Sequence, residues 1–427
     1  MISHLLIEKI SAGEHDGFFA DLYGEQAVES QKSRYLSAVE KFEEIYGKNK
    51  DISIYSAPGR TEICGNHTDH NCGLTLAAAI SDDALCVAAK NDENTLKIYS
   101  EGYEEIQPIN LEKLRATVSD EGSSRGIVKG ICAGIIKNGG QCRGLDLYIT
   151  SDVLKGSGLS SSASFENVVA AAVNHEHNDG RFTAAQLAAV SQYAENEYYA
   201  KPCGIMDQIA SAVGGAVCID LDNPQQPQVT SLPLDLDSFG LELCSVDTRA
   251  DHEDLTEEYA AIPKEMKDIA QIFMKDSLRR LDLETYVNHI SFLRDMLGDR
   301  AILRGMHFYM ECKRVQELCD AVENNDKDKF LKIIIESGHS SYEYLQNAYV
   351  RGNVKNQPMS VALSLAQSFL QDKGGAWRLQ GGGFAGAIQC FVPKQYLKEF
   401  IAYMEIVLGE NCCKVTKLRS KGAIKCM

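Results

Sequence analysis

A glycine- and serine-rich stretch between two apolar segments constrains the fold of this chain most. Residues 155–164 read Lys-Gly-Ser-Gly-Leu-Ser-Ser-Ser-Ala-Ser, after an apolar run at 145–150 and before small apolar residues at helical spacing. Glycines let the backbone turn tightly, and the first amides of a helix lack partners inside it. Such a helix start favours phosphate, and serine hydroxyls can bind phosphate oxygens or a hard cation. The sequence predicts a strand, an anion-binding turn and a helix; a flexible loop before an ordinary helix is the alternative.

The length of the chain predicts more than one core. With 427 residues it exceeds a typical single domain, so we expect two. No apolar run reaches the roughly 20 residues that span a bilayer, and the first residues lack the basic start and apolar core of a signal peptide. We therefore expect a cytoplasmic protein without a membrane partner.

The charge of the chain limits its partners. A net charge of -17 argues against nucleic acid, which attracts basic surfaces, but allows a small anionic ligand at a local helix dipole. The 14 cysteines are scattered, so we expect reduced thiols rather than disulfides or zinc ligands. We expect a monomer or a weak oligomer.

The order of apolar patterns predicts an α+β protein with two domains, residues 1–221 and 228–427, joined by the turn-rich residues 222–227. In the first domain we expect strands at 51–57, 74–80, 84–89, 96–99, 145–150 and 216–221, those at 74–99 forming an antiparallel sheet, and helices at 37–46, 126–136, 186–199 and 205–213. In the second we expect strands at 241–246, 387–392 and 414–417, with helices within 254–346 and at 395–408.

Three further features are candidates for a functional site. Residues 60–73 follow the expected end of a strand at Pro58-Gly59 and crowd an arginine, acidic groups and histidines between apolar runs, which favours a polar ligand site over a solvated loop. Asp207 lies in the first turn of an expected helix, where an acidic residue commonly complements the helix dipole. The glycine-rich residues 381–386 allow close backbone approach to a ligand, although a turn is the ordinary interpretation.

Four separated motifs together resemble one family, the GHMP small-molecule kinases, and within it the galactokinase-like members. Residues 58–69 resemble the sugar signature, residues 158–164 the nucleotide loop, residues 203–208 the segment with the catalytic aspartate, and residues 381–386 the C-terminal glycine motif. The resemblance covers residues from about 50 to 390 in family order. It implies an N-terminal domain like ribosomal protein S5 domain 2, a ferredoxin-like C-terminal domain, and phosphoryl transfer from MgATP to the anomeric hydroxyl of a hexose bound between them.

The resemblance also implies roles for individual residues. Asp207 and Arg60 match the catalytic pair, in which a carboxylate accepts or orients the hydroxyl proton and a guanidinium stabilises charge. Ser162 and Glu195 match the Mg²⁺ ligands, and an oxygen-only set suits that ion. The residues implied to bind the nucleotide are Lys155, Gly156, Ser157, Gly158, Leu159, Ser160, Ser161, Ser162, Ala163 and Gly382. Those implied to bind the sugar are Glu62, Asn66, His67, Asp69, Gly204 and Tyr259.

The sugar signature departs from the family pattern. Glu62 stands where relatives have asparagine, Asn66 where they have the glutamate that holds the hydroxyl on sugar carbon 6, and His70 where they have tyrosine. Loss of charge at Asn66 would make an altered group on sugar carbon 6, such as the carboxylate of galacturonate, less repelled, whereas Glu62 would restore the charge and keep a neutral sugar. An anomeric kinase for a modified hexose, galacturonate or N-acetylgalactosamine, is therefore the alternative. We expect galactose as the substrate, with galactose 1-phosphate as the product.

Two other functions stay open at this point. A galactokinase-like protein can be a non-catalytic sugar sensor, although such proteins lose residues of the serine loop, and this chain keeps Ser162, Ala163 and Asp207. A GHMP kinase for a non-sugar substrate is disfavoured because His67 and Asp69 suit a polyol better than a mostly apolar acid.

Overall fold

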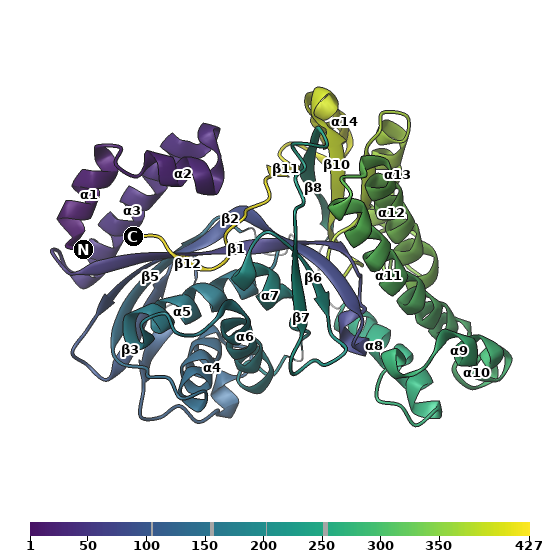
Figure 1. The fold of residues 1–427 in the computed structure, drawn as a ribbon, viewed down its shortest axis with the longest axis horizontal. Coiled ribbons are helices and arrows are strands. Elements are labelled where there is room, and N and C mark those ends of the chain that lie inside the picture. The colour runs from purple at the N-terminus through teal and green to yellow at the C-terminus, as the bar shows by residue number, and fades with distance from the viewer. Residues whose placement is uncertain (104–105, 154–157, 202, 251–254) are drawn as a thin grey trace.

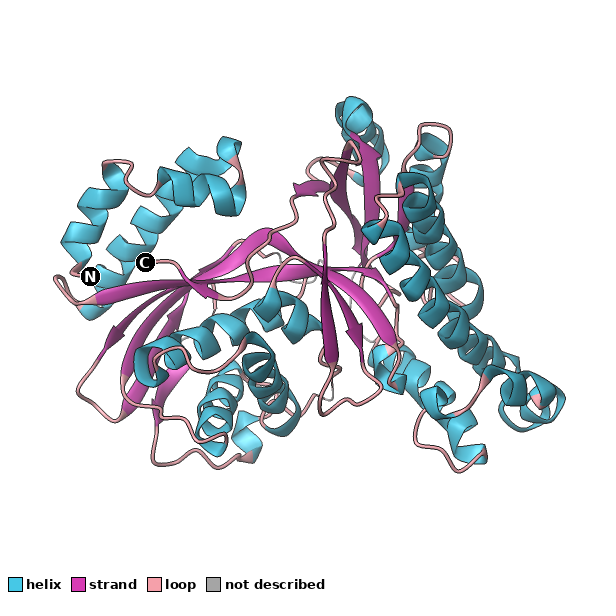
Figure 2. Ribbon diagram, viewed as in Figure 1, coloured by secondary structure: helices cyan, strands magenta, loops and turns pink. Residues whose placement is uncertain are grey.

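The computed structural model of the chain describes residues 1–103, 106–153, 158–201, 203–250 and 255–427. Within these residues two β-sheets form the centres of two units, and helices cover both (Figures 1 and 2). This arrangement confirms the predicted α+β architecture. No helix in the described ranges is both long and apolar enough to cross a membrane.

The larger sheet contains 8 strands in the described part of the chain, in the order β12-β1-β2-β5-β3-β4, with β6 and β7 paired along another part of β2. Their bounds are β1 Ile52–Cys64, β2 Leu74–Lys90, β3 Thr95–Ser100, β4 Ile106–Asn110, β5 Leu145–Ser151, β6 Ala216–Asp220, β7 Gln228–Leu232 and β12 Ile424–Lys425. The first part of β2 pairs with β6 and its last part with β5, so this strand links both halves of the sheet.

Helices cover both faces of the larger sheet (Figure 1). On one face lie α1 Ser3–Ser11, α2 Asp16–Tyr23 and α3 Val28–Tyr46, and on the other α4 Ser124–Lys137, α5 Ser161–Asn178, α6 Ala184–Glu197 and α7 Met206–Val213. Alternation along the strands explains this: Leu85 and Val87 pack with the N-terminal helices, whereas Cys86 and Ala88 pack with α4 and α5. Both faces are therefore buried.

The smaller sheet has 4 strands within the described residues, in the order β11-β8-β10-β9. Its strands are β8 Leu241–Ala250, β9 Ala376–Leu379, β10 Gly386–Pro393 and β11 Cys413–Thr416. The helices of this unit are α8 Thr256–Ile272, α9 Leu283–Asn288, α10 Ile290–Leu297, α11 Asp299–Glu323, α12 Lys327–Ser340, α13 Pro358–Leu370 and α14 Leu397–Leu408. After β11 the chain returns to the larger sheet, where β12 pairs with β1 near the N-terminus (Figure 1). The sequence predicted neither β9 nor this return.

Three strand predictions were wrong in extent or pairing. The strand predicted to end at Pro58-Gly59 continues to Cys64, because a β-bulge between Pro58 and Arg60 absorbs the irregularity. The strands predicted at 74–80 and 84–89 are the single strand β2, and β3 pairs parallel to β5 rather than with β2. Continuous pairing brings Arg60 onto a rigid strand instead of a loop.

The predicted connection at 222–227 is a hairpin turn. Strands β6 and β7 on its two sides pair antiparallel within the larger sheet. The chain therefore passes from the larger to the smaller sheet after Leu232 and before Leu241, later than the sequence indicated. A turn-rich composition marks a turn but does not distinguish a hairpin from a linker between domains.

Candidate active site

A cavity of about 1150 Å³ lies between the larger sheet with its helices and the α8 region of the second unit. Both halves of the chain contribute side chains to it. The predicted site residues that line it are Arg60, Glu62, Asn66, His67, Asp69, Ser162, Glu195, Gly204, Asp207, Tyr259 and Gly382. The structure therefore brings together residues more than 300 positions apart in the sequence.

Arg60 and Asp207 form a bidentate ion pair in this cavity. The Nε of Arg60 donates to Oδ1 of Asp207 at 2.7 Å, and Nη2 donates to Oδ2 at 2.6 Å. The hydroxyl of Ser160 donates to Oδ2 at 2.7 Å. The Asp207 side chain keeps 30% of its surface exposed, so the carboxylate still faces the cavity. Two parallel N–H bonds to one carboxylate fix both groups in one orientation.

Charge in this pair favours an ionised aspartate. Burial by itself would raise the pKa of Asp207, but attraction and hydrogen bonding by Arg60, with the bond from Ser160, hold that pKa below its usual value. The carboxylate is therefore negative at neutral pH. A negative oxygen here can accept a hydrogen bond from, or orient, a substrate hydroxyl.

Local structure explains how both residues reach this position. Asp207 occupies the first turn of α7, as predicted, and α7 ends at Gly214. Ser211 of the same helix donates its hydroxyl to the carbonyl oxygen of Pro58 at 2.6 Å, which fastens α7 to the bulge of β1. The bulge then directs Arg60 toward the helix start. Asp207 therefore does more than complement a helix dipole.

The described part of the predicted nucleotide loop leads into α5. Ser160 precedes the helix in the left-handed region with φ of 57°, and Gly158 has φ of 73°, a conformation that glycine adopts readily. Leu159 and Ala163 are buried, so Leu159 offers its backbone and not its side chain to a ligand. Ser162 lines the cavity, which places the helix start beside the ion pair. Lys155, Gly156 and Ser157 lie outside the described residues.

An acidic cluster adjoins the helix start. Glu195, predicted as a metal ligand, accepts a hydrogen bond on Oε2 from Nε2 of Gln208 at 2.9 Å, and Glu166 accepts from the same nitrogen at 3.1 Å. Lys201 lies 3.2 Å from the other oxygen of Glu195. Burial and the neighbouring Glu195 raise the pKa of Glu166 well above its usual value. Ser162 and Glu195 line the same cavity, and their hydroxyl and carboxylate oxygens suit a hard cation.

Polar contacts organise the opposite end of the cavity. His67 shares a hydrogen bond of 2.9 Å with the carbonyl oxygen of Gly382, and burial, with His70 nearby, lowers the pKa of His67 to about 4. His67 is therefore neutral at physiological pH. Tyr259 donates its hydroxyl to the carbonyl oxygen of Gly383 at 2.6 Å and so supports the glycine-rich loop.

Gly204 leaves room for Asp69. A Cβ atom at Gly204 would lie 2.0 Å from Oδ2 of Asp69, closer than any real contact. Asp69 also accepts a hydrogen bond from the backbone N–H of His70 at 2.9 Å. Glycine is thus required where the carboxylate faces the cavity.

The sequence did not identify several residues that the structure places at the site. Gln208 and Lys201 line the cavity beside Glu195, and Lys264 and Lys267 of α8 add positive charge at its wall. Glu166 was missed although it lies four positions after Ser162, the spacing that places two residues on one face of a helix.

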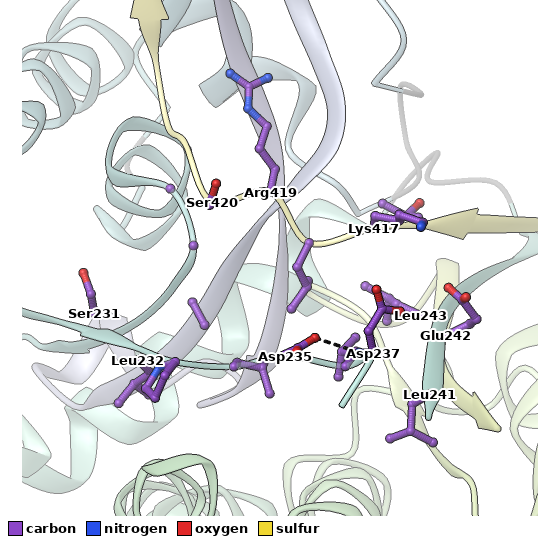
Figure 3. Close-up of a pocket in the computed structure, with 18 of the residues that line it drawn as sticks. Ser231, Leu232, Asp235, Asp237, Leu241, Glu242, Leu243, Lys417, Arg419 and Ser420 are labelled. Atoms are coloured by element: carbon purple, nitrogen blue, oxygen red, sulfur yellow. Dashed lines mark hydrogen bonds between the residues drawn. The ribbon is translucent and has the colours of Figure 1, made fainter. Parts of the chain in front are cut away.

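A second cavity, of about 620 Å³, is lined by residues 213–216, 231–237, 241–243 and 416–420 (Figure 3). It contains Asp235, Asp237, Glu242 and Lys417, none of which the sequence predicted as functional. Arg419 borders it but extends away, toward Ser56 and Asp83 (Figure 3). Arg60, Asp207 and Ser162 line the first cavity and do not line the second.

Comparison with known proteins agrees with the geometry. Residues 40–90 match the galactokinase galactose-binding signature, and residues 126–215 match the GHMP kinases N terminal domain. A galactokinase of Streptomyces coelicolor is 31% identical over 356 residues, which are 82% of this chain and 86% of that protein. A galactokinase of Glaesserella parasuis is 28% identical over 89% of this chain and 94% of its own length.

A solved structure shares the fold. The crystal structure of Lactococcus lactis galactokinase complexed with galactose superposes with a TM-score of 0.77 at 24% identity, covering 92% of this chain and all of that one. The two-unit arrangement around the cavity is therefore the fold of GHMP kinases.

Proposed function

Because this chain belongs to the galactokinase family of GHMP kinases, we propose that it transfers the terminal phosphoryl group of ATP to the anomeric hydroxyl of galactose, giving galactose 1-phosphate. The observation that carries the proposal is the Arg60–Asp207 pair beside Ser160. It places a negative acceptor for a hydroxyl proton next to a positive group at the start of a helix that favours phosphate.

The reaction needs an alcohol oxygen to attack phosphorus while its proton departs. The ionised Asp207 can take or orient that proton, and the guanidinium of Arg60 keeps the carboxylate ionised and stabilises negative charge on the transferred group. The amides and hydroxyls at the start of α5, including Ser161, bind the phosphates in this proposal. Catalysis then consists mainly of positioning and charge stabilisation, as is typical of phosphoryl transfer.

Ser162 and Glu195 are the proposed Mg²⁺ ligands. Their hydroxyl and carboxylate line one cavity, and Gln208 holds the carboxylate in place. Within the described residues no group of three histidine, cysteine or acidic side chains forms a complete metal site, which fits an ion held partly by nucleotide phosphates and water. When bound, Mg²⁺ supplies positive charge that neutralises the phosphate oxygens.

At the sugar end, the polar groups of His67 and Asp69 suit a polyol. Gly204 leaves the space that Asp69 occupies, and Tyr259 supports the loop on which Gly382 lies. These groups are proposed to bind hydroxyl groups of galactose. Since Nε2 of neutral His67 donates to the carbonyl oxygen of Gly382, its Nδ1 can accept a hydrogen bond from a sugar hydroxyl, whereas a protonated imidazole could only donate.

An ADP-release assay tests the proposal. The purified protein is incubated with MgATP and separately with galactose, N-acetylgalactosamine, galacturonate, glucose or arabinose, and the product is identified by ³¹P NMR. We expect ADP release with galactose and a phosphate on its anomeric carbon. Galactose binding by calorimetry without ADP release would instead indicate a non-catalytic sugar sensor.

A further inference from the structure

Glu62 occupies the wall of the active-site cavity, held by a fully buried arginine. Nη2 of Arg378 donates to Oε1 of Glu62 at 2.9 Å, and Nη1 donates to the Glu62 backbone carbonyl at 2.8 Å. Arg378 is 0% exposed and Glu62 is 3% exposed. Because Arg378 donates to both the backbone and the side chain of Glu62, it fixes the direction of the Glu62 carboxylate.

Asn66, the neighbour that replaces the usual glutamate, is engaged by the protein itself. Its Nδ2 donates to Oε1 of Glu62 at 3.0 Å and to the carbonyl oxygen of Gly381 at 2.7 Å. Its Oδ1 accepts from Nδ2 of Asn347 at 2.8 Å and from the hydroxyl of Ser341 at 3.4 Å. A side-chain amide has two N–H donors and an oxygen with two lone pairs. Asn66 therefore has no free hydrogen-bonding capacity for a substrate.

The two oxygens of Glu62 differ in this respect. Arg378 and Asn66 both reach Oε1, whereas no donor among the described residues is bonded to Oε2. Since the side chain lines the cavity, Oε2 is the acceptor available to a bound molecule. Relatives carry glutamate at the position of Asn66 and asparagine at the position of Glu62. In this chain the cavity wall therefore still has one carboxylate, but it comes from a residue four positions earlier.

We propose that Glu62 determines which sugar is accepted: its carboxylate accepts a hydrogen bond from a sugar hydroxyl group and repels a sugar that carries a carboxylate. Asn66 and Arg378 position Glu62 without contacting the substrate. This inference depends on the sugar kinase function proposed above. It selects a neutral hexose over a uronic acid, because a like charge at a buried wall is costly for the bound state.

The test compares kcat/KM for galactose and galacturonate in the wild type and in Glu62→Gln. Glutamine keeps the shape of the side chain and removes its charge. We expect kcat/KM for galactose to fall about 10- to 100-fold, as for loss of a hydrogen bond to a charged group. We also expect the ratio of kcat/KM for galactose to kcat/KM for galacturonate to fall at least about tenfold, because glutamine does not repel the carboxylate of galacturonate.

A reciprocal variant covers the case in which Glu62→Gln leaves Arg378 unpaired and folds poorly. In Glu62→Asn/Asn66→Glu the carboxylate returns to the position that relatives use. We expect it to keep the preference for galactose, whereas Glu62→Asn alone should lose it. Thermal unfolding of each variant shows whether the protein that is assayed is folded.

A matched control is Glu265→Gln. Glu265 also pairs with a buried arginine, Arg304, at 2.9 Å, but it does not line the cavity. The control should leave the ratio of the two kcat/KM values unchanged. An unchanged ratio in folded Glu62→Gln, or a wild type that prefers galacturonate, would overturn the inference. A wild type that releases no ADP with any sugar would instead refute the kinase function.

Discussion

The backbone N–H of Arg60 donates a hydrogen bond of 2.9 Å to the carbonyl oxygen of Leu159. This bond joins the bulge of β1 directly to the turn before α5. The preceding Gly59 allows the approach, since a Cβ atom there would lie 2.7 Å from the same oxygen. The positive group of the ion pair and the phosphate-binding helix start are therefore fixed to each other by main chain, which keeps their relative position independent of flexible side chains.

Replacing Asp207 with asparagine tests the proposed proton acceptor. Asparagine has nearly the same shape but cannot remain negative or accept a proton. We expect kcat to fall about 10²- to 10⁴-fold, with a smaller change in the KM for galactose. Steady-state ADP release measures both constants. Wild-type turnover in Asp207→Asn would remove Asp207 from the mechanism.

Substituting Gly204 with alanine tests the space beside Asp69. The added Cβ would lie 2.0 Å from Oδ2 of Asp69 and force that carboxylate to move. We expect the KM for galactose to rise about tenfold or more, because displacement of about 1 Å is costly at a binding site. Gly17→Ala is the control, since a Cβ atom at that helical glycine meets nothing within 4 Å. Equal KM values in both variants would show that Asp69 does not contact the sugar.

Local signals in the sequence predicted local structure well. Helices were predicted at 186–199 and 205–213, and the structure has α6 and α7 there, α6 opened by a capping box from Thr183 to Gln186 and α7 ended by Gly214. Both signals act through the backbone within a few residues. For the same reason the sequence placed Asp207 in a first helical turn, although its bond to Arg60 was implied only by the resemblance.

Signals that depend on distant neighbours were misjudged. The strands predicted at 74–80 and 84–89 left Asp83 outside both, yet β2 continues through this buried aspartate, which Arg34 and Arg419 neutralise. Arg378 showed no motif of its own, and its role depends on Glu62, 316 residues away. Such pairings follow from tertiary packing, which a periodicity of hydrophobic residues does not encode.

The buried Asp83 offers a test of stability away from the active site. Nη1 of Arg34 donates to Oδ1 at 2.6 Å, Nη1 of Arg419 donates to Oδ2 at 2.8 Å, and Tyr23 donates to Oδ2 at 2.6 Å. Asp83→Asn leaves the fully buried Arg419 without this anion and Arg34 with Asp152 in its place, so we expect a loss of about 3 to 5 kcal/mol in the free energy of unfolding. Urea unfolding measures it.

An exposed ion pair provides the comparison. Asp51 pairs with the N-terminal amine at 2.6 Å, but 81% of its side chain is exposed. Asp51→Asn should therefore change the unfolding free energy by no more than about 1 kcal/mol. Similar losses of unfolding free energy in Asp83→Asn and Asp51→Asn would mean that burial does not increase the contribution of Asp83 to stability.

The same aspartate predicts a dependence of stability on pH. Burial would raise the pKa of Asp83, but attraction to Arg34 and Arg419 lowers it below its usual value. A lowered folded-state pKa contributes stability that is complete above the unfolded value of about 3.9 and is lost as the pH falls through the folded value. We expect the wild type to lose stability below about pH 4 more steeply than Asp83→Asn, as urea titrations at several pH values would measure. Parallel curves would contradict this assignment.

Glu195 gives a prediction about Mg²⁺ that can be measured apart from turnover. Its Oε2 accepts a hydrogen bond from Gln208, and its Oε1 lies 3.2 Å from Nζ of Lys201. Lys201 therefore balances the negative charge of Glu195, as a bound cation would. In Glu195→Gln the carboxylate is lost, and we expect Mn²⁺ binding in the presence of ATP, followed by electron paramagnetic resonance, to weaken about tenfold or more. Glu176→Gln, which removes a carboxylate that does not line the cavity, should bind Mn²⁺ as the wild type does. Unchanged Mn²⁺ affinity in Glu195→Gln would mean that ATP phosphates and Ser162 hold the cation without this side chain.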